Sequence, residues 1–563
     1  MTLLFSCALL AACGGDSASG DAGTDAGNDA GQDAGTGDAG TDGGPHVAIP
    51  VTANSIQATS GPGRSDPEGV APAVDHVTEL TWHDSTGAVR TLSLGGYLYQ
   101  YDFSFLGGQA DPSAVTQRSA NDDAWGHPGF GYLVSHNTVT GNSPIGKANV
   151  PQSLTTTVFA GGHHALYRVQ VVYDRDHEGG GNGIKMPATI DWFVATGRDH
   201  PVWAVTWKMG AVSNPNGTDL NTYRMDTRAP YGSLNFDGAA TRNDGDEVGG
   251  VAWGDFQKKF VTTSSPLTMN ASWSYNTAND VAFTQAWTTH TNAEMGIVQT
   301  RTGDGQMGYP DRVAGRERGV TSADAYTDKG DCAGFGDVRP YAMPCVDGWP
   351  YQLMNYDWEP GGTGLDASSG TKLVAWGTPY GYLGSASFDG FSGTADGRGD
   401  RAYSTFIVLG PKCRYQAGVC DQPGAVSAEL AQVEALNAAQ VQDVTQGALV
   451  TQVPKGPGAT QTKTLVGGYD DTYATYDLTA AGNQAAFTFA PAAAQPVEKP
   501  IFVVQDFTAT TLPTVTVDGT ALGVNGGDES SGAFVSLDVA HQTLWVTLNR
   551  TVAAPILVQI GPG

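Results

Sequence analysis

The chain has 563 residues, too many for one ordinary hydrophobic core, so two or more domains are expected. It carries 57 Asp and Glu residues against 29 Lys and Arg, a formal net charge of −28. Seven of the acids lie between Asp16 and Asp42, and the rest of the chain remains acidic. Binding to DNA or RNA needs a basic footprint on the phosphates, so this composition argues against nonspecific nucleic-acid binding.

The first thirteen residues, MTLLFSCALLAAC, form a short apolar run that ends in small residues and a cysteine. Leu10-Ala11-Ala12-Cys13 resembles the lipobox of bacterial lipoproteins, which implies removal of the leader and lipidation of Cys13. The run is too short to span a bilayer. No basic residue precedes it, which leaves an ordinary secretion signal or a start codon further upstream as alternatives. The resemblance predicts a lipid-anchored protein of the bacterial cell surface or outer membrane, which contacts the membrane only through its anchor.

Residues 14–45 repeat Asp-Ala-Gly, mostly at a period of four. Such a tract has few side chains to bury and its charges repel one another, so it predicts a disordered tether. It lacks the closing Glu and the apolar anchors of a calcium-binding loop.

Residues 46–420 predict a large β domain. Asp84-Ser85-Thr86-Gly87 and the stretch from Gly197 to Pro201 have the composition of turns between strands. Residues 167–173 are apolar at period two. More than a dozen strands without intervening helices predict stacked antiparallel sheets or a barrel.

Two adjacent histidines, His163 and His164, follow a Gly-Gly turn. Neighbouring strand residues face opposite sides of a sheet, so two interpretations remain open. In one, either histidine is a base or ligand at a cleft; in the other, one packs in the core and one is solvated.

The stretch YRMDTRAPYGSLNFDG, residues 223–238, offers residue types that suit a lyase. Pro230 predicts that Arg228 and Tyr231 project from a loop. Cleavage next to a uronate needs a group that neutralises the carboxylate, a base and an acid. Arg228 and Asn235 suit the first role and Tyr231 the others; a loop held together by its own Arg–Asp pairs is the alternative.

Acidic residues suggest two further kinds of site. Asp244, Asp246 and Glu247 are a weak calcium candidate, or a solvated acidic turn, and no cofactor is required. A glycosidase needs two carboxylates across a cleft, for which three residues are eligible: Asp191, Glu294 and Glu359.

The segment GYPDRVAGRERG places Arg312, Arg316 and Arg318 within seven positions. Arginine binds carboxylates in a bidentate manner, so Arg312 and Arg316 are candidates for holding an anionic polysaccharide. The neighbouring acids could equally neutralise them, and exposed pairs of that kind add little stability.

Aromatic residues gather in DGWPYQLMNYDWEPGG, a stretch with the composition of a loop. Aromatic faces stack on the apolar faces of sugar rings, so Trp349, Tyr351 and Trp358 are candidate glycan contacts. Packing in a core is the alternative.

Four cysteines remain outside the leader, in two local pairs. The simplest of three connectivities joins Cys332 to Cys345 and Cys413 to Cys420, which suits an oxidising compartment. The spacings do not fit a zinc site.

Residues 421–461 predict an amphipathic helix and linker, with Val426, Leu430, Val433 and Leu436 at helical spacing and Gly447 as its C-cap. Residues 462–563 return to strands and predict a small C-terminal β-sandwich.

A large β domain, a linker and a smaller β-sandwich resemble, as an order of elements, some polysaccharide lyases. The large domain of those proteins is a galactose-mutarotase-like supersandwich. The resemblance implies a monomeric carbohydrate-active protein with a polysaccharide as its partner. A polysaccharide lyase cleaving a uronate-containing polymer by β-elimination is the first hypothesis; a non-catalytic glycan-binding or adhesive lipoprotein and a glycoside hydrolase are the alternatives.

Overall fold

The computed structural model divides into two compact units, Met1–Pro45 and His46–Gly563. The second unit contains every residue that the structure describes: 55–61, 76–94, 101–105, 133–134, 155–175, 184–208, 211, 231–235, 248–254, 259–262, 283–288, 294–302, 355–358, 372–376, 400–416, 419–526 and 531–563. The predicted leader and tether, with Cys13, lie outside the described residues.

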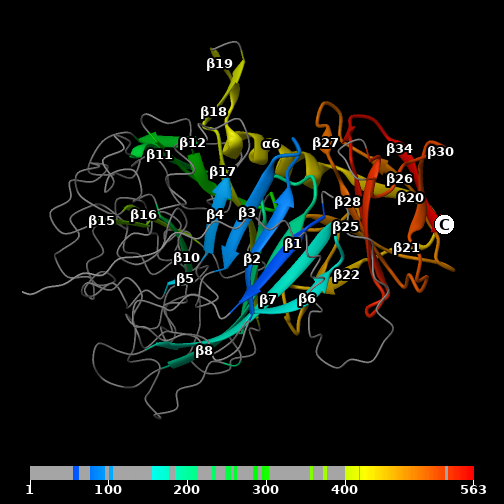
Figure 1. Cartoon of the computed structure of the whole chain (residues 1–563), viewed down its shortest axis with the longest axis horizontal. Coiled ribbons are helices and arrows are strands. Elements are labelled where there is room, and N and C mark those ends of the chain that lie inside the picture. The colour runs from blue at the N-terminus through cyan, green and yellow to red at the C-terminus, as the bar shows by residue number, and fades with distance from the viewer. Residues whose placement is uncertain are drawn as a thin grey trace, which may run out of the picture. The chain divides into compact units, whose positions relative to one another are not determined.

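A nine-stranded antiparallel sheet is the largest element (Figure 1). Its strands are, in spatial order, β12 (Lys259–Thr262), β11 (Val248–Gly254), β13 (Phe283–Thr288), β14 (Glu294–Gln299), β17 (Arg401–Gly410), β9 (Val202–Trp207), β8 (Ile184–Ala195), β7 (His164–Arg175) and β6 (Thr155–Ala160). β7 and β8 pair along twelve residues each, from His164 opposite Ala195 to Arg175 opposite Ile184. The predicted turn at 197–201 joins β8 to β9, and Gly197 adopts a φ of 86° there.

Two four-stranded antiparallel sheets belong to the same unit. The first has the order β1 (Gln57–Gly61), β2 (His76–His83), β3 (Val89–Leu94) and β4 (Tyr101–Phe105). The predicted hairpin turn at Asp84–Gly87 joins β2 to β3, with Gly87 at a φ of 82°. The second has the order β15 (Asn355–Trp358), β16 (Lys372–Trp376), β10 (Tyr231–Asn235) and β5 (Leu133–Val134).

Helix α6 (Ala425–Ala438) follows the large sheet. Its buried side chains include Val426, Val433 and Leu436, and Leu430 packs against the same core, as the helical spacing predicts. A residue far away in the sequence caps its first turn: Glu294 Oε1 of β14 accepts the Val426 N–H at 2.7 Å. The carboxylate therefore satisfies a backbone donor that the helix itself leaves free.

The predicted helix end at Gly447 is wrong. The helix ends at Ala438, and the chain turns directly into β20 (Gln440–Gln446), which pairs with β26 (Ala485–Ala490). Gly447, with a φ of 81°, lies instead in the turn before β21 (Ala448–Leu449). The spacing of apolar residues continues through this region, but strand pairing competes with the helix and ends it.

The C-terminal part is a β-sandwich, shown in orange and red in Figure 1. One sheet has five strands in the order β20, β26, β34 (Ile556–Pro562), β29 (Pro513–Val517) and β30 (Thr520–Ala521). The other has β21, β25 (Thr475–Thr479), β28 (Ile501–Gln505), β32 (Thr543–Leu548) and β31 (Ala533–Asp538), with β24 (Tyr469–Asp470) beside β25. Because β20 and β21 are strands of these sheets, the sandwich begins at Gln440, earlier than the expected boundary at 462. In the described residues, the all-β, multi-sheet fold with a connecting helix is thus as predicted.

Two short antiparallel ladders complete the described C-terminal strands. They pair β22 (Gln452–Pro454) with β23 (Thr462–Thr464), and β27 (Val497–Glu498) with β33 (Thr551–Val552).

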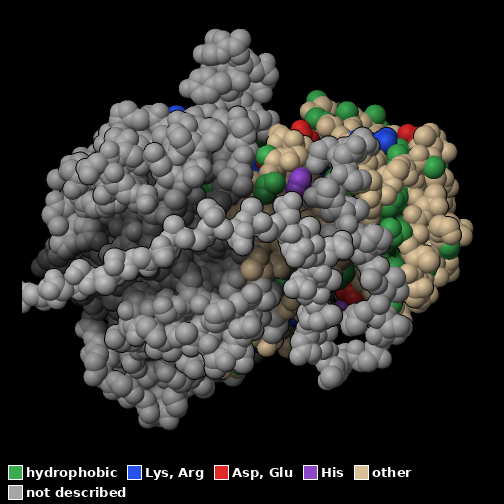
Figure 2. Space-filling model, in the orientation of Figure 1, with side chains coloured by type: hydrophobic (Ala, Val, Ile, Leu, Met, Phe, Trp, Pro, Cys, Tyr) green, Lys and Arg blue, Asp and Glu red, His purple; other side chains and the backbone are tan. Residues whose placement is uncertain are grey.

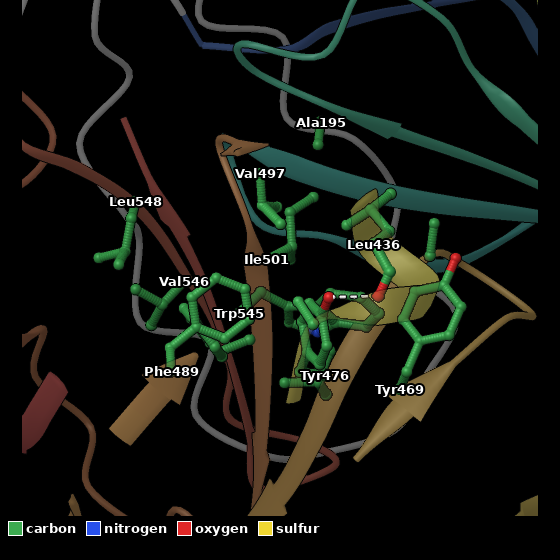
Figure 3. Packing of buried hydrophobic residues seen from close by; sticks show 14 of the residues in the cluster. Ala195, Leu436, Tyr469, Tyr476, Phe489, Val497, Ile501, Trp545, Val546 and Leu548 are labelled. Carbon is green, nitrogen blue, oxygen red and sulfur yellow. Dashed lines mark hydrogen bonds between the residues drawn. The ribbon is translucent and has the colours of Figure 1, made fainter. Parts of the chain in front are cut away.

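A continuous hydrophobic core joins the large sheet, α6 and the sandwich. One face of the large sheet contributes Leu166, Phe193 and Phe406 to the same buried cluster as Leu436 and Tyr476. Figure 3 shows aromatic and aliphatic side chains from the helix and the sandwich strands packed together, with the Tyr476 hydroxyl donating to the Leu436 carbonyl at 2.6 Å. Burial of this apolar surface is the main force that joins these elements.

A two-stranded hairpin, β18 (Cys413–Gln416) and β19 (Val419–Pro423), precedes the helix. Its register places Cys413 opposite Pro423 and Cys420 opposite Tyr415. The two cysteines are thus on paired strands but not directly opposite each other. The Cys413–Cys420 disulfide remains a prediction, and Cys332 and Cys345 lie outside the described residues.

The contact between β17 and α6 predicts the effect of a single methyl group. A Cβ atom at Gly410 would lie 2.6 Å from the Ala425 Cβ, so Gly410→Ala must push the helix away from the sheet. We expect it to lower the free energy of unfolding by about 1–3 kcal/mol in urea denaturation. Gly523→Ala is the matched control, because no heavy atom lies within 4 Å of its added Cβ. Equal stability of the two variants would contradict the close packing of α6.

Candidate functional site

Both candidate histidines are buried between the large sheet and the C-terminal sandwich. The exposed fraction is 1% for His163 and 0% for His164. His163 Nδ1 lies 3.1 Å from Thr196 Oγ1, and its ring stacks on Phe534 at 5.2 Å between centroids. Neither histidine is solvated or open to a cleft, so neither interpretation from the sequence holds. His163 immediately precedes β7, so the alternation of side chains along the strand does not apply to it. The sandwich contacts both histidines and buries them together.

The hydrogen bonds around His164 define its tautomer. Ser536 Oγ accepts the backbone N–H groups of His163 and His164, both at 3.0 Å. Its own proton is therefore directed to His164 Nδ1, also at 3.0 Å. His164 Nε2 then carries the proton that it donates to Thr547 Oγ1 at 2.8 Å. A neutral ring with both nitrogens bonded is a structural link between β7 and the sandwich rather than a free base.

Burial lowers the pKa of both rings. It lowers the pKa of His163 to about 4. For His164, burial is the largest cause of a pKa well below the ordinary value, and His163 and Arg198 add to it. Both rings are therefore neutral at physiological pH, which agrees with the hydrogen bonds.

Two of the other candidates lie on one strand. Tyr231 begins β10 and Asn235 ends it, with Tyr231 opposite Val134 and Asn235 opposite Leu373. The expectation that Tyr231 projects from a loop is wrong, because β10 pairs on both sides. The two residues are four apart, so their positions share one face of the sheet.

The neighbouring strands extend this face. Asp357 of β15 is opposite the same Leu373, and Asn355 and Ser233 are both opposite Ala375. Directly opposed residues share a face, so five polar positions lie on it: Tyr231, Ser233, Asn235, Asn355 and Asp357.

The candidate Trp358 lies on the same sheet but on its other face. It is in β15 opposite Lys372, one position from Asp357. The looped conformation expected for this stretch is therefore wrong at Asn355–Trp358. Trp358 does not share a face with Tyr231 and Asn235. The remaining candidates lie outside the described residues: Arg228, Arg312, Arg316, Trp349, Tyr351, Asp244, Asp246, Glu247 and Glu359.

The two described carboxylates eligible for a glycosidase have structural partners. Asp191 accepts both Nε and NH2 of Arg168, at 2.7 and 2.8 Å, and the Tyr473 hydroxyl at 2.6 Å. Glu294 caps α6 and accepts the Gln285 amide at 2.5 Å. These contacts give no support to Asp191 and Glu294 as a catalytic pair.

A polar pocket of about 80 Å³ lies where the β2–β3 turn, the β8–β9 turn and the start of α6 meet residues 498 and 499. Its charged and polar lining consists of Asp84, Ser85, Thr86, Arg90, Arg198, Asp199, His200, Glu429, Gln432, Glu498 and Lys499. Pockets for drug-sized ligands measure roughly 300–1,000 Å³. This pocket therefore suits a few waters or a small ion, not a polysaccharide segment.

Two acids on the pocket wall are held by the turns. Asp84 Oδ1 accepts the N–H groups of Thr86 and Ala88, and its Oδ2 pairs with Arg90 Nε at 2.9 Å. Asp199 Oδ1 accepts the Ser85 N–H at 2.8 Å. Burial would raise the pKa of Asp199, but Arg90, His200 and the Ser85 hydrogen bonds together hold it below its ordinary value.

Glu429 on α6 behaves in the opposite way. Its Oε2 lies 3.9 Å from His200 Nε2, and its side chain is 12% exposed. Burial raises its pKa to about 8, with Arg198 opposing the shift. Glu429 therefore carries a proton at neutral pH, while Asp199 is ionised.

Sequence reasoning missed this pocket. The sequence predicted the turns at Asp84–Gly87 and 197–201 but no site at them. No sequence spacing indicates that these turns lie near Glu429. The composition of the turns and the acidic residues of the helix, Glu429 and Glu434, were the visible signals.

Elsewhere, the described residues show neither a metal site nor a membrane span. No group of three or more His, Cys, Asp or Glu side chains among them is placed to hold a metal ion. No helix among them is long and apolar enough to cross a membrane. On the face in Figure 2, the described surface carries scattered charged side chains rather than a patch of one sign.

Comparison with known proteins gives no family. The chain matches no protein-family model and no curated protein. Among solved structures, it is similar to an Enterococcus faecalis protein of glycosyl hydrolase family 38, with 8% identity and a TM-score of 0.24 over 75% of this chain. It is similar in the same way to an Enterococcus faecalis alpha-mannosidase, with 7% identity and a TM-score of 0.24 over 86% of this chain.

The chain spans 38% and 41% of these two proteins. A third structure, the N-terminal domain of a Streptococcus gordonii adhesin, has 8% identity and a TM-score of 0.13, over 90% of this chain and 81% of that domain. Likenesses at these TM-scores carry no argument about fold or activity.

The buried histidines predict an acid-sensitive fold. The pKa of His163 is about 4 in the folded chain and near 6.5 when unfolded, so the unfolded state takes up the proton first as the pH falls. The stabilising contribution is complete above pH 6.5 and is lost between pH 6.5 and 4, by up to about 1.4 kcal/mol per pH unit. We expect His163→Asn, whose amide can replace Nδ1, to reduce this slope in urea unfolding across that range.

Gln442→Asn is the control for this measurement, because Gln442 is exposed and its amide does not titrate. It should leave the slope unchanged. An unchanged slope in His163→Asn as well would show that His163 does not cause the acid sensitivity.

Proposed function

We propose that the protein cleaves a uronate-containing polysaccharide by β-elimination on the face of the β15–β16–β10–β5 sheet that carries Tyr231 and Asn235. The observation behind this proposal is that five polar positions share that face with Val134, Leu373 and Ala375, while the other face carries Leu234, Val374, Tyr356, Trp358 and Trp376 together with Gly232, Lys372 and Leu133. The other face is the more apolar of the two, and an antiparallel sheet packs its more apolar face on a core. The polar face is then the one on which a hydrophilic polymer can bind.

The chemistry requires one group at the uronate carboxylate and one that moves protons. The base removes the proton from C5, the electron pair forms the C4–C5 double bond, and the C4–O bond breaks with its electrons on the leaving oxygen. An acid then protonates that oxygen. Tyr231 is the proton-transferring residue of this proposal, and a guanidinium group of Arg228, Arg312 or Arg316 would stabilise the charge that develops on the carboxylate.

The spacing of the two residues agrees with a sugar bound along the strand. Strand residues four apart are separated by about 13 Å between Cα atoms. At that separation, the Asn235 amide would donate to the carboxylate of a sugar unit adjacent to the one on which Tyr231 acts.

The burial of the two histidines supports Tyr231 as the proton-transferring residue of this proposal. His163 and His164 were the other candidate bases, and both are buried and hydrogen-bonded between the large sheet and the sandwich. Arg228, Arg312 and Arg316 have the guanidinium groups that would bind further carboxylates of the polymer.

The location that we propose is the outer surface of a bacterial cell. Cys13 would carry the lipid, and the Asp-Ala-Gly tract at 14–45 would hold the folded unit away from the membrane.

The activity has a direct readout. Addition of alginate, pectin or a glycosaminoglycan should produce a rise in ultraviolet absorbance from the conjugated unsaturated uronate. We expect Tyr231→Phe to lower kcat by about 100-fold or more, because it removes the proton-transferring group. Tyr356→Phe is the matched control, since it removes a hydroxyl from the opposite face of the same sheet. Equal rates in the two variants would exclude Tyr231 from the chemistry.

A second candidate function is glycan binding without cleavage. It is favoured by Tyr356, Trp358 and Trp376, whose positions share the other face of the sheet. Aromatic faces stack on sugar rings. Binding of these polysaccharides without any unsaturated product, weakened by Trp358→Ala but not by Tyr231→Phe, would favour this function over the lyase.

A further inference from the structure

The polar pocket between the β2–β3 turn, the β8–β9 turn, α6 and residues 498 and 499 is called the junction pocket. Its distinguishing feature is a buried cation, Arg198, that forms no ion pair with a described carboxylate. Arg198 is 9% exposed, and its NH2 donates to the Ala474 carbonyl at 3.1 Å. Its guanidinium also lies 5.8 Å from the centroid of the Phe406 ring. Within the described chain, no carboxylate oxygen forms an ion pair with Arg198, and its Nε has no hydrogen-bond acceptor. An arginine remains charged in proteins, so this is a desolvated positive charge beside an enclosed space.

The contrast with Arg90 in the same pocket is informative. Arg90 pairs with Asp84 at 2.9 Å and donates to the Leu409 carbonyl at 2.7 Å. One arginine of the pocket is thus paired with a carboxylate, and the other has no such partner among the residues that the structure describes.

We propose that the pocket binds one small oxyanion, such as sulfate, phosphate or a free carboxylate, against Arg198. The volume of about 80 Å³ suits a single small polyatomic ion, since a water occupies about 30 Å³ in the liquid. The oxyanion would contact the exposed edge of the Arg198 guanidinium, because the Nε itself has no exposed surface. Lys499, whose Nζ donates to the Ser85 carbonyl at 3.1 Å, lies on the same wall and adds positive charge.

The charges around the pocket make this binding depend on Glu429. The groups that face it are Asp84 and Arg90 from the first hairpin, Arg198, Asp199 and His200 from the β8–β9 turn, and Glu498 and Lys499 from the sandwich. Apart from Glu429 and His200, three basic and three acidic side chains face the pocket, so their formal charges cancel when Glu429 carries a proton. An ionised Glu429 would add a negative charge to the pocket and take the anion's place near Arg198. Anion binding and protonation of Glu429 therefore favour each other.

A titration with sodium sulfate at constant ionic strength tests the proposal, with the full chain and thermal unfolding as the readout. Wild-type protein at pH 6.5 should show a saturable rise in Tm at millimolar sulfate. Because the pKa of Glu429 is about 8, about a tenth of the chains carry its proton at pH 9, and the apparent affinity should fall about tenfold. Sodium acetate in place of sulfate distinguishes a carboxylate site from one selective for sulfate and phosphate.

Two variants separate this site from a general salt effect. Glu429→Gln mimics the protonated side chain, so it should keep the sulfate response and lose the tenfold difference between pH 6.5 and 9. Arg198→Gln should abolish the saturable response, whereas Arg550→Gln, at an exposed position, should keep it. A response that rises linearly without saturation, or that has the same pH dependence in wild type and Glu429→Gln, would overturn the proposal. The second comparison remains decisive even if Arg198→Gln does not fold.

Discussion

The described fold depends on one polar contact surface, where the nine-stranded sheet meets the C-terminal sandwich. His164 bonds to Ser536 and Thr547, and the Arg168–Asp191 pair bonds to Tyr473. His164, Arg168 and Asp191 lie on the same face of the large sheet as Leu166 and Phe193. Leu166 and Phe193 belong to the shared core. A buried donor or acceptor that loses its partner costs about 1–3 kcal/mol, so neither half can leave the other without exposing apolar surface and orphaned polar groups. This is why residues more than 370 positions apart belong to one compact unit.

The same surface limits where a function can be located. In an acidic chain, many carboxylates are available, but the described buried ones have structural duties. Glu294 accepts an N–H of the first turn of α6, Asp84 closes a hairpin turn, and Asp400 accepts the Thr460 N–H of the loop before β23. Their contacts satisfy backbone donors that would otherwise be buried without a partner. A count of acidic residues and histidines therefore indicates structural hydrogen bonds as readily as a catalytic site.

The sequence predicted those features that short segments determine. The turns at 84–87 and 197–201, the buried face of α6 and the β-rich composition are local patterns, and each is confirmed. The pattern failed where a distant strand decides the outcome: β20 ends α6 before Gly447, and pairing on both sides makes Tyr231 a strand residue despite Pro230. The burial of His163 could not be foreseen either, because Ser536 and Phe534, which contact it, are more than 370 residues away in the sequence. Prediction of the polar positions that share a face with Tyr231 required the register of β15, β16 and β10, which the spacing of residues in the sequence does not reveal.

In the junction pocket, the charge of Arg90 contributes to the fold, whereas the fold does not require the charge of Arg198. A buried ion pair is often no more stabilising than apolar residues of the same volume, so charge in an interior is weak evidence of stability. Arg90 is accounted for by Asp84 and the turn that this acid closes. Arg198 contributes one hydrogen bond to Ala474 and contact with Phe406, which a neutral side chain of similar length could largely reproduce. Its positive charge raises the cost of folding, and Glu429 does not offset that cost while it carries a proton. A small anion from solution would supply the missing partner, and it would do so without changing any contact on which the sheet and the sandwich depend.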